Sequence, residues 1–186
     1  YGMPVYVMID EVLDRMFVAV MAGPSPPGGA PKQPAIAIYN NASTVQGTDA
    51  ADILVAGPST RLAAGNNQTT HNTWYDRASS TLFAGHHTNE VLLYDMSSVD
   101  WEPSEPSTLD LTPAVLEIHE EESGSDQNDW SAYGLFYVPE LDRLFVSVGA
   151  TKGGDEEHSG APEAGSPDNS IKIYDDITTR DLSGLE

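Results

Sequence analysis

The chain of 186 residues contains no cysteine, and this absence excludes several kinds of site. Without thiols it cannot form a disulfide, a thiolate metal site or a cysteine nucleophile. The sequence also has no run approaching about 18 consecutive apolar residues, so no membrane-spanning helix is predicted. No signal peptide is recognisable.

Basic residues are scarce as well. Lysine and arginine together number 8, against 29 aspartates and glutamates, which gives a formal net charge of −21. Such a surface repels nucleic acid and anionic membranes, because phosphate groups need basic partners. The self-repulsion is screened at molar salt, where the Debye length falls to about 3 Å. The acid excess, with Lys32, Lys152 and Lys172 as the sole lysines, is typical of a halophilic protein. An ordinary acidic protein and a cation-binding surface are the alternatives.

We therefore expect a protein without membrane insertion and without a nucleic-acid partner. The composition fits either the cytoplasm of a salt-accumulating organism or secretion. It does not distinguish these two compartments.

Motifs of common catalytic sites are also missing from the sequence. There is no G-x-S-x-G nucleophile elbow, no G-x-x-x-x-G-K-[ST] phosphate loop and no G-x-G-x-x-G dinucleotide motif. We predict no catalytic residue, and the sequence favours a non-catalytic role.

A repeated phrase is the strongest feature that is present. Residues 12–22 read VLDRMFVAVMA, residues 140–150 read ELDRLFVSVGA, and residues 79–87 read the shorter SSTLFAGHH. Each phrase lies between apolar segments rich in Val, Ile, Leu, Phe and Tyr and bounded by turn residues, which is typical of β-strands. A repeat of this kind predicts one supersecondary unit used several times.

The strands expected from this pattern fall into three units. The first unit contains segments 4–11, 14–20, 35–40 and 52–64. The second contains 71–78, 79–87, 90–95 and 113–121, and the third contains 132–140, 142–148 and 170–175. Thr112 and Pro113 also fit a helix start before AVLEIHEE, but the place of this segment in the repeat favours a strand.

The phrase LDRLFVSV, followed after a loop by NSIKIYD, resembles the β-propeller repeat of the YVTN and NHL type. The resemblance implies an all-β, β-propeller-like fold with three four-stranded blades, the last of them incomplete. The expected organisation is one domain over 1–186, with repeats at about 1–64, 70–121 and 130–186. A β-sandwich built from repeated hairpins is the alternative fold.

Three blades are too few to close a ring, since propellers have roughly four to eight. An open arc would expose an apolar face at each end and an unpaired strand edge. We expect a homo-oligomer, namely a dimer that completes a ring, or completion by a partner chain or by the rest of a longer propeller.

The resemblance further implies that ligands bind at the rim formed by the loops after the second and fourth strands of each blade. The candidate ligand-binding residues there are His71, His86, His87, Asp129 and Trp130. The candidate metal ligands are Asp126, Asp129, Asp155, Glu156 and His158. Imidazole and carboxylate groups can hold a transition metal, and carboxylates alone can hold Ca²⁺. Solvated loops are the alternative, and His86 and His87 are adjacent at a strand end, where neighbouring side chains point to opposite faces.

These patterns favour a non-catalytic ligand-binding, protein-binding or assembly module. They establish no cofactor, and Ca²⁺ or another divalent metal is the candidate. The alternative is a metal-dependent propeller hydrolase of the lactonase type, with Ca²⁺ or Zn²⁺ held at the mouth of the channel.

Overall fold

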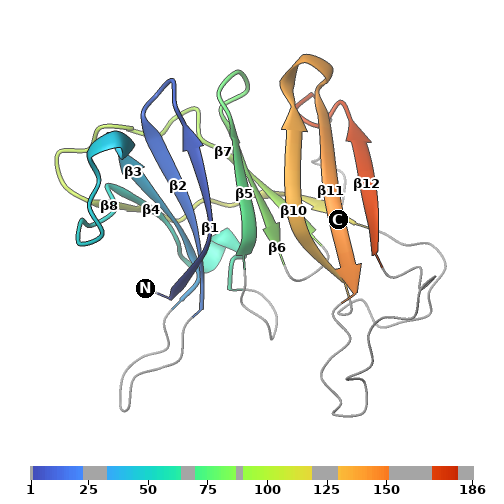
Figure 1. Ribbon diagram of the computed structural model, residues 1–186, viewed down its shortest axis with the longest axis horizontal. Helices are drawn as coiled ribbons and strands as arrows, with labels where there is room; N and C mark the ends of the chain where they lie inside the picture. The colour runs from blue at the N-terminus through green and yellow to red at the C-terminus, as the bar shows by residue number, and fades with distance from the viewer. Residues whose placement is uncertain are drawn as a thin grey trace, which may run out of the picture.

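The computed structural model describes residues 2–22, 33–63, 70–86, 90–118, 130–150 and 169–179. These residues form three β-sheets that lie side by side (Figure 1). The described segments contain strands, turns and three short 3-10 helices, and none of them is a helix that is long and apolar enough to cross a membrane. The all-β prediction is confirmed.

The first sheet has the order β1-β2-β3-β4-β8. Its strands are β1 (Met3–Asp10), β2 (Arg15–Met21), β3 (Ala35–Asn40), β4 (Ile53–Val55) and β8 (Ser107–Leu109). The second sheet has the order β5-β6-β7-β9. Its strands are β5 (Thr70–Asp76), β6 (Thr81–His86), β7 (Glu90–Asp95) and β9 (Ala114–Glu117).

The third sheet has the order β10-β11-β12, and the described part of the chain adds no fourth strand to it. Its strands are β10 (Trp130–Val138), β11 (Arg143–Ala150) and β12 (Asn169–Asp175). The 3-10 helices are η1 (Ala42–Thr44), η2 (Pro58–Thr60) and η3 (Pro139–Leu141). In Figure 1 the turns β1–β2, β5–β6 and β10–β11 all lie at the same end of the sheets.

Most predicted strands are present, with two differences in extent. The strand expected over 52–64 is limited to β4, because Gly57 has a φ of 139° and Pro58 begins η2. In the segment 113–121, β9 covers Ala114–Glu117, which confirms the strand that its place in the repeat indicated, and residues 119–121 lie outside the described residues. One strand, β8, was not predicted: it pairs in parallel with β4 and extends the first sheet, although it follows β7 of the second sheet in the chain.

Successive sheets pack face to face, and one face of each sheet contacts the opposite face of the next sheet. Phe17 of β2 stacks on Tyr75 of β5, with ring centroids 5.0 Å apart. Phe83 of β6 lies against Tyr137 of β10, with centroids 5.1 Å apart. We call the face that carries Phe17, Phe83 or Phe145 the leading face of its sheet, and the opposite face the trailing face.

Two hydrophobic cores fill the spaces between the sheets. The first core joins the leading face of the first sheet to the trailing face of the second, and includes Ile36, Ile38, Leu82, Ala84 and Tyr94. The second core joins the leading face of the second sheet to the trailing face of the third, and includes Val91, Leu93, Leu135, Leu144 and Val146. The same packing step is therefore made twice, which produces a propeller-like arc of three sheets.

The repeated Leu-Asp-Arg phrase forms the turn before the second strand. Asp14, Ser80 and Asp142 occupy this position, and all three have a left-handed φ between 44° and 54°. Aspartate and serine are accepted here because their short polar side chains tolerate this conformation. Backbone carbonyls at the three positions accept hydrogen bonds from Ala42, Met96 and Ile177, which follow the third strand of each sheet.

The two aspartate side chains add a second set of bonds. The Asp14 carboxylate accepts from the backbone N–H and the hydroxyl of Ser43, and the Asp142 carboxylate accepts from the same groups of Thr178. The phrase thus fixes the end of the third strand onto the hairpin.

Asp142 and Tyr137 form a coupled pair in the third sheet. Burial opposes ionisation of Asp142, but hydrogen bonds from Tyr137, Thr178 and Thr179 outweigh it, so the pKa of this carboxyl is lowered. Burial and the hydrogen bond to Asp142 raise the pKa of Tyr137 to about 12. At neutral pH the pair therefore consists of an ionised carboxylate and a neutral phenol.

We expect Asp142→Asn to lower the free energy of unfolding by about 1–2 kcal/mol at pH 7, because it weakens several hydrogen bonds to a charged acceptor. A lowered folded-state pKa stabilises the protein above the ordinary carboxyl pKa of about 4, and this stabilisation is lost as pH falls through the lowered pKa. The difference from the wild type in urea unfolding should therefore shrink below about pH 4.

Asp176→Asn is the matched control for this substitution. Asp176 also has a left-handed φ, of 57°, but it is exposed and its side chain makes none of these bonds. Equal losses in the two variants would contradict the role assigned to Asp142.

Candidate functional site

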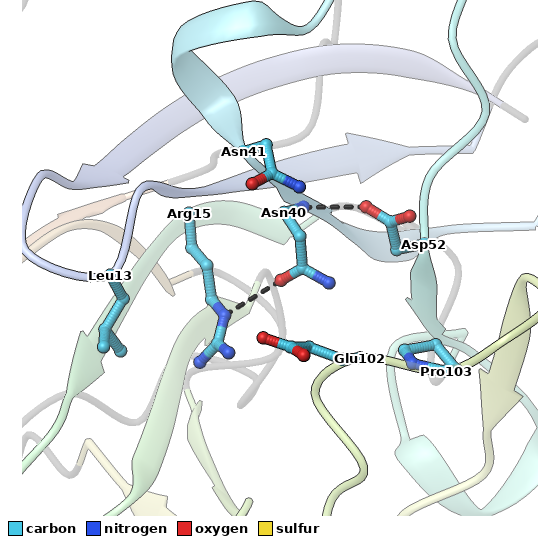
Figure 2. Close-up of a pocket in the computed structure, with 7 residues that line it drawn as sticks. All are labelled: Leu13, Arg15, Asn40, Asn41, Asp52, Glu102 and Pro103. Atoms are coloured by element: carbon cyan, nitrogen blue, oxygen red, sulfur yellow. Dashed lines mark hydrogen bonds between the residues drawn. The ribbon is translucent and has the colours of Figure 1, made fainter.

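A polar pocket of about 390 Å³ lies at the hairpin end of the first sheet (Figure 2). It is lined by Leu13, Arg15, Asn40, Asn41, Asp52, Glu102 and Pro103. Arg15 and Asn40 come from neighbouring strands, and their Cα positions are paired across β2 and β3.

Asn40 is at the centre of the hydrogen bonds in this pocket. Its Oδ1 accepts from Nε of Arg15 at 2.9 Å, and its Nδ2 donates to the Trp101 carbonyl at 2.5 Å. Its backbone N–H donates to the Asp52 carboxylate at 2.7 Å. The Arg15 guanidinium also lies over the Trp101 ring, 4.3 Å from its centroid. These contacts hold the connection after β7 onto the first sheet.

The third sheet has an equivalent of this pair that differs in charge. Arg143 donates to Asp175 at 2.5 Å, and the two residues are paired across β11 and β12 as Arg15 and Asn40 are in the first sheet. The neutral Asn40 thus replaces an aspartate, and its amide group allows the additional bond to Trp101. The pocket lining combines charged and amide side chains with Leu13 and Pro103, and the Asn40 bonds join the pocket to the segment around Trp101.

The two predicted rim histidines that the structure describes lie on neighbouring strands of the second sheet. His86 at the end of β6 is fully buried, and its Nε2 lies 3.1 Å from the carbonyl oxygen of Leu62. His71 follows Thr70, the residue paired with His86, and its ring lies 4.7 Å from that of Tyr133. His86 therefore contacts the protein interior rather than an open rim.

The other predicted site residues cannot be placed in this way. Trp130 begins β10, and only its backbone is described. The remaining candidates lie outside the described residues: His87, Asp126, Asp129, Asp155, Glu156 and His158. Within the described ranges, no three His, Asp or Glu side chains are grouped so that they could hold a metal ion.

The exposed leading face of the third sheet was not among the predicted site residues. The leading positions of the third strand are occupied in each sheet by branched aliphatic residues: Ile36 and Ile38, Val91 and Leu93, and Ile171 and Ile173. In the first two sheets these side chains are buried between sheets. In the third sheet Ile171 is 68% exposed and Ile173 is 55% exposed.

Aromatic residues continue this face onto the neighbouring strands. Phe145 lies directly between Phe136 and Ile173 in the strand register, and Phe136 is 56% exposed. Aligning the three repeats on their phenylalanines could have identified this surface from the sequence. It is the open end that three packed sheets leave on the arc.

The trailing face of the first sheet is the open end on the other side. Val7 pairs with Val18, and Ile9 pairs with Met16, so these side chains share the face that points away from the second sheet. Val18 belongs to a small cluster within the first sheet and is nearly buried, whereas Ile9 is 56% exposed. The exposed part of this face therefore follows β1.

No protein-family model and no curated protein sequence matches the chain. Among solved structures, the chain is similar to the β-propeller domain of Cps50 (Swd1) from Myceliophteria thermophila, with 12% sequence identity and a TM-score of 0.39. The similarity covers 96% of this chain and 53% of that one, so this chain spans about half of its length. The propeller-like arrangement described above is a property of the three sheets of this chain, and the YVTN and NHL resemblance stays a prediction.

The different surroundings of Asn40 and Asp175 give a testable difference. We expect Asn40→Ala to lower the free energy of unfolding by about 1–2 kcal/mol, because it removes the partly buried bonds to Arg15 and Trp101. Asp175→Ala should cost less than about 1 kcal/mol, because it removes an exposed ion pair. Urea unfolding at low and molar salt measures both values.

Salt separates the two effects further. The loss in Asn40→Ala should persist at molar salt, whereas screening should remove most of the loss in Asp175→Ala. A larger or more persistent effect of Asp175→Ala would show that the Asn40 contacts do not support the structure as described.

Proposed function

We propose that this chain is a non-catalytic assembly module that binds protein through the open ends of its arc of sheets. The observation that carries the proposal is the exposure of Ile171 and Ile173, whose equivalents in the other two sheets are buried by the next sheet. A surface that fits a neighbouring sheet twice within the chain fits a third sheet supplied from elsewhere.

The energetics of the exposed face support a protein partner. Each fully buried isoleucine contributes about 1.5–3 kcal/mol relative to its exposed state. Phe136, Phe145, Ile171 and Ile173 form one contiguous surface without a charged side chain among them. Contiguous apolar surface on a protein with a net charge of −21 is typical of an interaction site.

The acidic composition supports a salt-adapted form of this function. Two such chains repel one another at low ionic strength, and screening removes that barrier. We therefore propose that the module associates best at high salt, where burial of the apolar face is opposed by little charge repulsion.

The test uses the chain itself as the binding probe, at molar salt. We expect the wild type either to self-associate in sedimentation velocity or, as a monomer, to bind the apolar dye ANS at the exposed face. The double variant Ile171→Glu/Ile173→Glu should show neither signal, because it places two charges on that face.

Val12→Glu/Leu141→Glu is the matched control. Both residues are large, apolar and exposed, but they lie in hairpin turns and not on the leading face. A wild type that stays monomeric and binds no more ANS than the face variant would overturn the proposed function.

A further inference from the structure

We infer, resting on the proposed function, that a second copy of this chain covers the exposed leading face of the third sheet. The trailing face of the first sheet of the second copy would pack on this leading face. It would contact the leading face as the next sheet does in the two interfaces within one chain. Two chains joined head to tail in this way form a closed ring of six sheets.

The first step of the argument is the repeated contact inside one chain. The phenylalanine of the second strand packs on a tyrosine of the first strand of the next sheet, as Phe17 on Tyr75 and Phe83 on Tyr137. Phe145 has the same place in β11 and faces away from the second sheet. The structure thus specifies which surface of a partner the third sheet accepts, namely a trailing face.

The strand register identifies the residue that would receive Phe145. Each tyrosine is the strand partner of the residue that precedes the phenylalanine of its own sheet. These pairs are Tyr75 with Leu82 and Tyr137 with Leu144. In the first sheet the corresponding pair is Ile9 with Met16. Ile9 therefore occupies the position that accepts an aromatic ring in the other two sheets, and it is exposed.

The two open faces also agree in chemical character. The trailing face of the first sheet presents Val7 and Ile9 beside Met16 and Val18, with no charged side chain among these four. The leading face of the third sheet presents phenylalanine and isoleucine. Each face would desolvate apolar surface against the other without burying an unpaired charge.

The number of copies follows from ring closure. A contact between two different faces of identical chains closes only when the rotations add up to a full turn, and otherwise it grows into a filament. The described residues of one copy form three sheets, and the only multiple of three within the roughly four to eight blades of propellers is six. This requires two copies, and both open faces of each copy are then covered.

The test combines two single charge variants, Ile173→Lys on the leading face and Ile9→Glu on the trailing face. Both residues are more than half exposed in the single chain, so each variant is expected to fold, which circular dichroism checks. Each variant alone should be mostly monomeric at molar salt, with a dimer dissociation constant raised by about 100-fold, because an unpaired charge is buried at both junctions.

An equimolar mixture should restore a dimer that contains one copy of each variant. One of its junctions then pairs the introduced lysine with the introduced glutamate, and the other junction is entirely wild type. The doubly substituted chain Ile9→Glu/Ile173→Lys should also dimerise with itself. A mixture of Ile173→Lys with Val12→Glu is the matched control and should restore no pairing between the lysine and a carboxylate.

A wild-type dimer whose charge variants are not rescued by mixing would overturn the head-to-tail pairing while leaving the proposed function in place. A wild type that is monomeric but binds ANS on the exposed face would have the same meaning. A monomeric wild type without ANS binding would overturn both.

Discussion

The contact between a phenylalanine on one sheet and a tyrosine on the next is the interaction on which this architecture depends. It occurs as Phe17 on Tyr75 and as Phe83 on Tyr137. Side chains alternate between the two faces of a strand, so a shift by one residue would turn the aromatic ring to the wrong face. The position of the ring therefore determines which other side chains of the sheet face its neighbour. Around these rings, the two cores are assembled from the same positions of successive repeats.

The strand register that this contact needs is set at the hairpin turns. A left-handed residue at Asp14, Ser80 or Asp142 ends the turn, and its carbonyl receives the chain that follows the third strand. Sequence differences between repeats change the side-chain bonds and leave this backbone arrangement intact. In the second sheet, for example, Ser80 stands at the position of the phrase aspartate, and Asp76 accepts from Ser79 within the turn as Asp10 accepts from Val12 and Leu13 in the first sheet.

The sequence predicted those features that arise from local patterns, such as the hairpins and the order of strands. It missed β8 because Ser107–Leu109 is short, and its pairing partner β4 lies more than 50 residues earlier in the chain. The sequence pattern placed His86 at the rim because it indicates the end of a strand but not the burial of the side chain. The bond between His86 and the Leu62 carbonyl joins segments that no local pattern relates. The open faces follow from counting repeats, but their exposed residues needed the register.

The large negative charge and the apolar end faces are compatible because they act at different ranges. Charge repulsion between two chains extends over about 10 Å at 0.1 M salt and keeps most surfaces apart, whereas burial of apolar side chains acts only at contact. A protein with a net charge of −21 can thus avoid unspecific aggregation and still present uncharged sheet faces. In the proposed assembly, a partner whose own contact face is apolar and shaped as a sheet gains from contact what offsets the remaining repulsion. The trailing face of the first sheet, along β1, meets both conditions.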